Sequence, residues 1–305
     1  MLVIFGPTAA GKSALAHAVA REIGAEIIVA DPFQRYRGLE IAADGPRVPE
    51  RAEVAYHLVA DLELSEESSA GTYAASAHEQ IDRLVDSGGT PLLTGGTGLY
   101  IRAALTDMRM RPAPPDDVRR WAEGLVAADL QAAVAELTAR DAGAAAAIDT
   151  DNPRRVVRAL ERAAMGDDAD GGGDIWSEPL RRPALVVGIT RPRDVVHRLI
   201  AQRVRRELDE GLVGELEHAL AQPGLARAPT QVIGMREVAA IGAGEMDAER
   251  LEEALNVRTR RLARMQETWM RRMAPDVVLD LGDRPAAGFA DDVVSHWRRA
   301  RGGVG

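Results

Sequence analysis

The feature that most constrains this chain is a glycine-rich loop close to its start. The loop consists of Gly6, Pro7, Thr8, Ala9, Ala10, Gly11, Lys12 and Ser13. It fills every fixed position of the phosphate-binding pattern G-x-x-x-x-G-K-[ST]. The apolar residues 2–5 before it predict a short strand, and the apolar spacing after it predicts a helix over residues 12–23. Strand, loop and helix in this order are the setting in which such a loop binds phosphate.

Each part of the loop has a chemical role. Its glycines let several backbone N–H groups surround an oxyanion, and the following helix adds the positive end of its dipole. Lys12 supplies a mobile positive charge, and the hydroxyl of Ser13 is a suitable ligand for Mg²⁺. The loop therefore predicts a site for a phosphate or diphosphate. It does not identify the compound, because any diphosphate ester suits the same backbone cradle.

A second strand, predicted over residues 25–30, ends at Asp31. A strand–helix–strand unit of this spacing indicates a parallel sheet with its ligand at the carboxyl ends of the strands. Asp31 then lies beside the phosphate loop, either as a functional acid or as a strand-end cap or outer Mg²⁺ ligand. Residues 32–38 mix amide, aromatic and guanidinium groups, a combination that suits a base or a sugar.

The rest of the chain predicts a P-loop NTPase-like α/β fold with an insertion. Strand patterns return at residues 92–93, 184–189 and 276–281, and a glycine-rich turn follows at 94–100. Prolines at 112–115 precede alanine-rich helical stretches, and residues 166–174 form an acidic, glycine-rich link. The helical stretches cover residues 116–127, 129–140 and 154–165. We predict a parallel-sheet core of residues 1–113 and 183–305 and a helical insertion domain of residues 114–182.

Composition restricts the class of protein. The 305 residues contain no cysteine, which excludes disulfides, thiolate metal sites and a cysteine nucleophile. No apolar run reaches membrane-spanning length and the chain enters a strand at once, so we expect a cytoplasmic protein with no membrane partner. The formal net charge is −9, yet segments 153–162 and 254–272 are rich in arginine. Arginine is well suited to phosphate contacts, so a polyanion would bind locally.

Two predicted helices place arginines in informative positions. In the helix from residue 194, Arg203 lies on the apolar stripe and therefore needs a phosphate, an internal salt bridge or a snorkelling path to water. In the helix over residues 247–273, one face is predicted to be apolar, and the opposite face is either solvated or a phosphate-binding surface. The apolar face comprises Leu251, Leu255, Leu262, Met265 and Trp269, and the opposite face comprises Arg260, Arg264 and Arg271.

The ordered set of motifs resembles the bacterial tRNA dimethylallyltransferases, also called tRNA isopentenyltransferases. No piece except the phosphate loop is specific alone, but the pieces occur in the family's order over most of the chain. They are the loop at 6–13, Asp31 with Gln34 and Tyr36, residues 95–100, residues 152–161, residues 190–193, Arg203 with Val204, residues 233–236, and residues 259–269.

The resemblance implies transfer of a dimethylallyl group from dimethylallyl diphosphate to N6 of the adenosine adjacent to the tRNA anticodon (position 37). The loop would hold the diphosphate with Mg²⁺, Asp31 would be the general base, and the target base would be flipped into the enzyme. Thr8, Lys12 and Arg203 would complete the diphosphate clamp. We expect a monomer that contacts the anticodon stem-loop. The expected tRNA-binding residues are Asp31, Pro32, Phe33, Gln34, Thr97, Arg119, Arg154, Arg155, Arg158, Gln231, Arg236, Arg260, Arg264 and Arg271.

Three positions depart from the family pattern. Pro32 replaces a serine, the segment 41–46 has lost a threonine and a lysine, and Met235 replaces a tyrosine. Two other functions therefore stay open at this point. One is a P-loop kinase for a nucleotide or small molecule, which would need a lid arginine and a Mg²⁺-binding acid. The other is a tRNA-binding relic with reduced activity.

Overall fold

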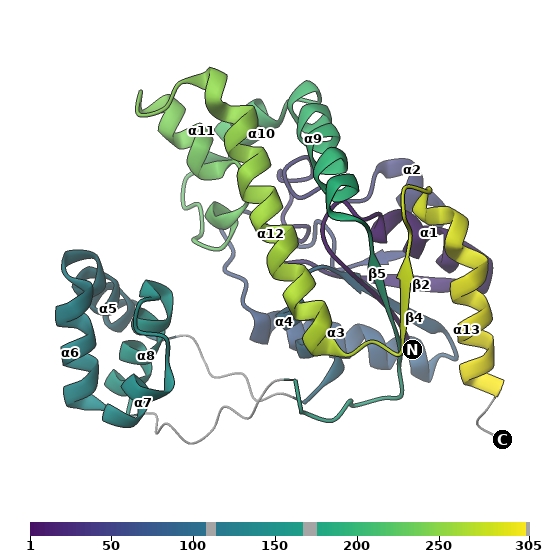
Figure 1. Ribbon diagram of the computed structural model, residues 1–305, viewed down its shortest axis with the longest axis horizontal. Helices are drawn as coiled ribbons and strands as arrows, with labels where there is room; N and C mark the ends of the chain where they lie inside the picture. The colour runs from purple at the N-terminus through teal and green to yellow at the C-terminus, as the bar shows by residue number, and fades with distance from the viewer. Residues whose placement is uncertain (108–113, 167–175, 303–305) are drawn as a thin grey trace. The chain divides into compact units, whose positions relative to one another are not determined.

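Six parallel strands form one sheet in a computed structural model of the chain, which describes residues 1–107, 114–166 and 176–302 (Figure 1). Across the sheet, the strands are Tyr56–His57 (β3), Ala25–Ala30 (β2), Thr90–Gly95 (β4), Leu2–Phe5 (β1), Leu185–Thr190 (β5) and Val277–Asp280 (β6). Strand β1 is fully buried, as expected for a parallel sheet with helices on both faces. The predicted α/β class with a parallel sheet is confirmed, and β3 is a strand that the sequence did not reveal.

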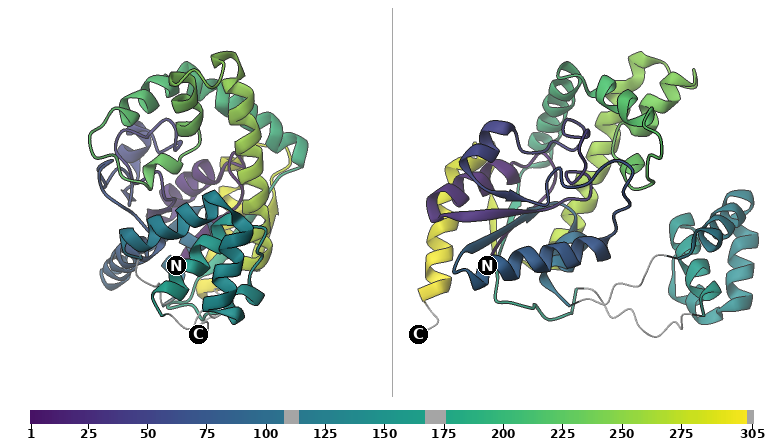
Figure 2. Two further views of the ribbon diagram at one scale, coloured as in Figure 1. Left: turned by 90° about the vertical axis from the view of Figure 1, so that its left-hand side faces the viewer. Right: turned by 180° about the vertical axis from the view of Figure 1, so that it is seen from behind.

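Helices cover both faces of this sheet (Figures 1 and 2). On one face, α1 (Lys12–Ile23) and α13 (Ala290–Gly302) enclose the main core, in which Leu15 and Val19 pack with Val293 and the strands. On the other face, α3 (Ala70–Asp86) packs against α4 (Gly98–Leu105). The short helix α2 (Val48–Glu53) lies just before β3.

The four α-helices between β5 and β6 pack in a second core, to which Tyr36, Leu39, Ala42 and Leu64 also contribute. They are α9 (Arg193–Asp209), α10 (Leu212–Leu220), α11 (Met235–Gly242) and α12 (Leu251–Met273). Buried Val196, Ile200 and Val204 of α9 contribute to this core, as the apolar stripe predicts. The long helix α12 packs against both α9 and α4, so it connects this core to the sheet.

The predicted apolar face of α12 is only partly right. Met265 is 46% exposed, whereas the buried positions include the polar residues Asn256, Thr259 and Gln266. The buried face is rotated relative to the predicted one, since Thr259 and Gln266 line the cavity and Gln266 accepts a hydrogen bond from the backbone N–H of Thr8 in the phosphate loop. Hydrophobic periodicity cannot detect a buried face that is polar for this reason.

The chain divides into two compact units, Met1–Met108 with Glu178–Gly305, and Arg109–Ser177. The second unit contains α5 (Asp116–Ala128), α6 (Leu130–Arg140), α7 (Ala142–Ala147) and α8 (Pro153–Ala164), which share a small apolar core. Residues 178–182, assigned above to the insertion, belong to the first unit, because Leu180 pairs with Thr106 and Arg181 forms an ion pair with Asp82. Most of the acidic link at 166–174, and residues 112 and 113 of the proline segment, lie outside the described residues.

Candidate active site

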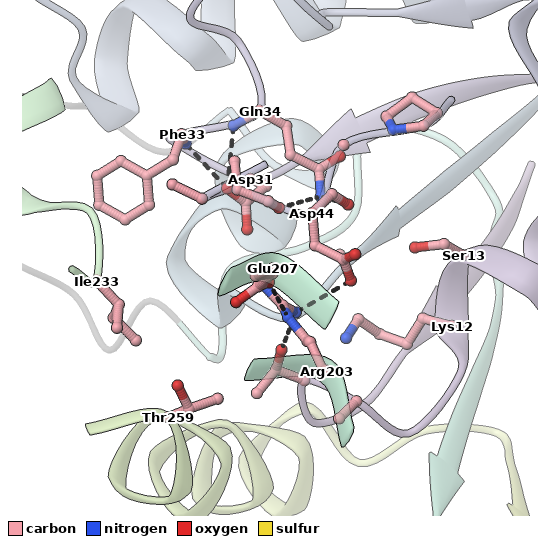
Figure 3. A pocket seen from close by; sticks show the side chains of 18 of the residues that line it. Lys12, Ser13, Asp31, Phe33, Gln34, Asp44, Arg203, Glu207, Ile233 and Thr259 are labelled. Atoms are coloured by element: carbon pink, nitrogen blue, oxygen red, sulfur yellow. Dashed lines mark hydrogen bonds and ion pairs between the residues drawn. The ribbon is translucent and has the colours of Figure 1, made fainter. Parts of the chain in front are cut away.

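A cavity of about 570 Å³ opens at the carboxyl ends of the strands, within the first unit (Figure 3). The phosphate loop, the end of β2, the segment 42–47, and helices α9 and α12 all contribute to its wall. The polar and charged side chains that line it include Thr8, Lys12, Ser13, Asp31, Gln34, Asp44, Arg203, Arg206, Glu207, Glu210, Thr259 and Gln266.

The phosphate loop has the tight turn that its glycines predict. Gly11 has φ 97°, and a Cβ there would lie 2.5 Å from the Cβ of Ala286, so only glycine fits. Lys12 donates from Nζ to the carbonyl of Pro7 at 2.8 Å. Burial, and then the charge of Arg203, lower the pKa of Lys12 to about 8. Lys12 is therefore a cation at neutral pH that loses its proton more easily than an ordinary lysine.

Arg203 reaches from α9 to the phosphate loop, although it lies 195 residues further along the chain. Its Nη1 donates to Oγ1 of Thr8 at 2.8 Å, and its Nε donates to Oε1 of Glu207 at 2.6 Å. The same Nη1 lies 3.2 Å from Oδ2 of Asp44. The sequence left three ways to accommodate the charge of Arg203: a phosphate, an internal salt bridge or a path to water. The structure shows an internal salt bridge, with Asp44 and Glu207. Sequence reasoning identified neither Asp44 nor Glu207.

Asp31 stands at the end of β2 and turns one carboxylate oxygen into the cavity (Figure 3). Its Oδ1 accepts hydrogen bonds from the backbone N–H of Phe33 at 2.9 Å and of Gln34 at 3.3 Å. Pro32 therefore does not remove the donors that orient this carboxylate. Burial raises the pKa of Asp31, and the two backbone hydrogen bonds and the charge of Lys12 oppose that rise.

Strand order explains how Asp31 comes to face the phosphate loop. Gly95 at the end of β4 pairs with Ala30 on one side and with Phe5 on the other. A Cβ on Gly95 would lie 2.3 Å from the carbonyl oxygen of Ala30, so a larger residue would push apart the strands that carry Asp31 and the loop. The glycine-rich turn thus brings the acid and the phosphate site to the same edge.

Gln266 connects α12 to the phosphate loop, a role that the sequence did not reveal. Its Oε1 accepts a hydrogen bond from the backbone N–H of Thr8 at 2.6 Å, and its side chain is almost completely buried. A Cβ on Gly96 would meet Nε2 of Gln266 at 2.3 Å, so that glycine makes room for the amide. In the sequence, Gln266 stood out only as one residue of the segment 259–269 that carries the family resemblance.

Comparison with known proteins identifies the family. The family model described as IPP transferase matches residues 34–273. The chain belongs to the IPP transferase family. It is 38% identical over 275 residues to the tRNA dimethylallyltransferase of Anaeromyxobacter dehalogenans, with 89% of this chain and 92% of that protein covered. It is 35% identical over 280 residues to that of Kineococcus radiotolerans, with 89% and 88% covered.

A solved structure agrees with this assignment. The full-length tRNA isopentenylpyrophosphate transferase from Bacillus halodurans is 29% identical and superposes with a TM-score of 0.72, covering 99% of this chain and 95% of that one. The resemblance seen in the sequence is therefore confirmed. The names of these relatives also favour a transferase over the P-loop kinase.

The expected tRNA-binding residues of this IPP transferase fall into separate groups. Phe33 and Gln34 line the cavity beside Asp31, whereas Pro32 and Thr97 are not among its lining residues. Gln231 and Arg236 lie together, with Nη2 of Arg236 donating to Oε1 of Gln231 at 3.1 Å. Thr97 is the residue immediately before α4.

On α12, Arg264 and Arg271 are exposed and Arg260 is half-buried. Arg260 lies 3.7 Å from Glu253, and Arg271 donates to the hydroxyl of Thr268 at 3.1 Å. Burial lowers the pKa of His197 on α9, and so do the charges of Arg260, Arg193 and Arg264, in that order. Cations of two helices thus gather around one histidine.

In the helical unit, the arginines differ in their partners. The carboxylate of Glu161 is buried and lies 3.1 Å from Arg158 and 3.7 Å from Arg119. Arg154 and Arg155 are exposed in the first turns of α8. Of the four arginines in this unit that are expected to bind tRNA, Arg119 and Arg158 share one carboxylate, and Arg154 and Arg155 face solvent.

The described residues contain neither a metal cluster nor a membrane span. Within residues 1–107, 114–166 and 176–302, no group of three or more His, Cys, Asp or Glu side chains is arranged to hold a metal ion. Over the same ranges, no helix has the length and apolar character needed to cross a bilayer.

Proposed function

We propose that this IPP transferase family member transfers a dimethylallyl group from dimethylallyl diphosphate to N6 of the adenosine next to the tRNA anticodon, with Asp31 as the general base. The observation that carries the proposal is one cavity in which Asp31 faces Lys12 and Arg203. The names of the relatives, tRNA dimethylallyltransferases, support the group transferred and the tRNA acceptor.

The proposed reaction forms one bond and breaks one. The N6 nitrogen attacks the allylic carbon of the donor, and the bond from that carbon to the diphosphate oxygen breaks. The proton lost from N6 goes to Asp31, and the diphosphate leaves with the bonding electron pair. A carboxylate whose pKa is raised by burial is a stronger base than an ordinary aspartate, which suits this role.

Positive charge in the cavity would stabilise the leaving diphosphate. Lys12 and Arg203 lie at the phosphate loop, and Thr8 offers a hydroxyl to the same site. Charged donors in a partly enclosed site stabilise negative charge that develops in the transition state. Backbone N–H groups of residues 6–13 and the N-terminus of α1 would add further donors.

The residues present fit a Mg²⁺ ion that is shared with the substrate. Ser13 lines the cavity at the start of α1, and the described residues offer no cluster that would hold a metal alone. Mg²⁺ commonly binds through few protein ligands together with substrate phosphates and water. We therefore propose that Ser13 and the donor phosphates hold the ion, which would neutralise charge on the diphosphate.

The arginines of α8 and α12 are the proposed contacts for the anticodon stem-loop. Arg154 and Arg155 are exposed on α8, and Arg264 is exposed on α12, near the cavity wall that α12 supplies. With a net charge of −9, attraction for a polyanion has to come from such local clusters. A flipped adenine would enter the cavity beside Phe33, and we propose that the enzyme acts as a monomer.

The test is transfer of label from radiolabelled dimethylallyl diphosphate to total tRNA. The wild-type protein is expected to label tRNA on N6 of that adenosine. Asp31→Asn keeps the shape of the side chain and should lower the transfer rate ~10²–10⁴-fold, with donor affinity nearly unchanged. Full activity of Asp31→Asn would exclude Asp31 as the base. Binding of tRNA by the wild type without transfer would identify a relic instead.

A further inference from the structure

Asp44 places a carboxylate among the cations of the proposed donor site (Figure 3). Its Oδ1 accepts from Nη2 of Arg206 at 2.7 Å, and its Oδ2 lies 3.2 Å from Nη1 of Arg203. All three side chains line the cavity. One carboxylate thus bridges two guanidinium groups at the position where an anionic substrate would be expected to meet them.

The backbone holds this carboxylate in place. Asp44 has φ 50°, a left-handed conformation that aspartate tolerates better than most residues. Nε2 of Gln34 donates to the carbonyl oxygens of Ala43 and Asp44, at 3.1 and 3.3 Å. On the preceding side, the carboxylate of Glu215 accepts from the N–H groups of Ile41 and Ala42 at 2.9 and 2.8 Å. The position of Asp44 is therefore built by the fold.

The same guanidinium of Arg203 that contacts Asp44 also contacts the phosphate loop. Nη1 lies between Oγ1 of Thr8 at 2.8 Å and the carboxylate of Asp44 at 3.2 Å. A diphosphate on the loop would bind the guanidinium of Arg203 and would therefore lie close to the Asp44 carboxylate. Two anions that share one guanidinium repel each other, and each loses part of its own attraction to the cation.

We infer that Asp44 is an internal counter-ion that competes with the donor diphosphate for Arg203 and Arg206 and thereby lowers donor affinity. The inference rests on the proposed assignment of the phosphate loop to the donor. Before donor binds, Asp44 pairs with the partly buried Arg203 and with the exposed Arg206. When donor binds, its phosphates replace the Asp44 carboxylate as the partner of the two arginines. Asp44 then either moves away or stays close to the phosphates and is repelled by them.

The test is binding of inorganic pyrophosphate by calorimetry at pH 7, with and without Mg²⁺. Asp44→Asn keeps the size of the side chain but removes the negative charge, and it should tighten pyrophosphate binding about 5- to 30-fold. Asp44→Ala should act in the same direction, which covers the case in which the asparagine variant folds poorly.

Glu252→Gln provides a matched control. Glu252 accepts from Nε of Arg205 at 2.9 Å, so the variant also removes one carboxylate from an arginine of α9, but Glu252 is not among the residues that line the cavity. Its effect on pyrophosphate affinity should be about twofold or less, because an exposed pair contributes little and is screened by salt.

Three results would overturn the inference. Pyrophosphate affinity that is unchanged in Asp44→Asn and Asp44→Ala would show that Asp44 does not compete. If the two Asp44 variants bind pyrophosphate more weakly than wild type only when Mg²⁺ is present, Asp44 is a metal ligand. If they bind it more weakly without Mg²⁺, Asp44 supports the arginines instead.

The Lys12→Ala variant distinguishes these three results from a wrong assignment of the donor site. If wild type binds pyrophosphate no better than Lys12→Ala, the assignment of the loop to the donor is wrong.

Discussion

Raising the pH above about 8 should inactivate the free enzyme by removing the positive charge of Lys12. Burial and the nearby Arg203 lower the pKa of this lysine from its ordinary 10.5 to about 8, although Asp31 and Asp44 act in the opposite direction. Lys12 is therefore charged below pH 8 and becomes neutral above it. Since this charge would attract the diphosphate in the proposed donor site, kcat/KM for the donor should fall on the alkaline side.

The size of the effect follows from the titration. Above the pKa, the charged fraction of Lys12 falls about tenfold for each pH unit, so log kcat/KM should decline with a slope near −1. The alkaline limb of kcat/KM reports the free enzyme, in which no bound phosphate raises the lysine's pKa again. The limb of kcat should therefore lie at higher pH than the limb of kcat/KM.

Two variants test the assignment of the limb. Lys12→Arg retains charge at all accessible pH values, so its activity, although lower, should show no alkaline limb near pH 8. Arg203→Gln removes the cation that helps to lower the pKa of Lys12, so the limb should move to higher pH while affinity for the donor falls. Both variants use the same donor, so ionisation of the donor itself is controlled.

The assay is initial-rate transfer to saturating tRNA over pH 6 to 10 at constant ionic strength, with limiting donor. A wild-type profile that stays flat to pH 9.5 would refute the reasoning, and so would an alkaline limb that persists unchanged in Lys12→Arg.

Two further predictions concern α12, and a third concerns the helical unit. Replacing Gln266 by Leu leaves the buried N–H of Thr8 without its acceptor. We therefore expect the free energy of unfolding to fall by about 1–3 kcal/mol and KM for the donor to rise. A denaturant titration and a KM that both equal those of wild type would contradict this. Replacing both Arg260 and Arg264 by Ala should flatten the slope of log tRNA affinity against log salt by roughly one to two. Replacing Arg154 and Arg158 by Ala should flatten the slope in the same way. Equal salt slopes for wild type and both double variants would exclude these helix faces as tRNA contacts. Pyrophosphate binding is the control, and it should not change in either variant.

The sequence by itself determined the local chemistry of the site. The loop at 6–13 follows from a motif whose glycines and lysine have fixed positions, and the strand and helix beside it follow from short-range apolar spacing. Asp31 could be placed at the sheet edge because parallel strands carry their ligands at the carboxyl ends. These features depend on residues close together in the chain, and local patterns report them.

Only the tertiary structure determined which partners meet at that edge. The family resemblance placed Arg203 in the same clamp as Thr8, and the structure adds their direct contact across 195 residues and the contact of Thr8 with Gln266 across 258. Strand β4 lies between β2 and β1 and sets the spacing of acid and loop. Asp44 stands in a segment that looked only like a loss of family residues, yet it bridges two arginines of α9. Such contacts depend on how distant elements pack and on which polar groups then need a partner. Periodicity along the chain therefore carries no record of them.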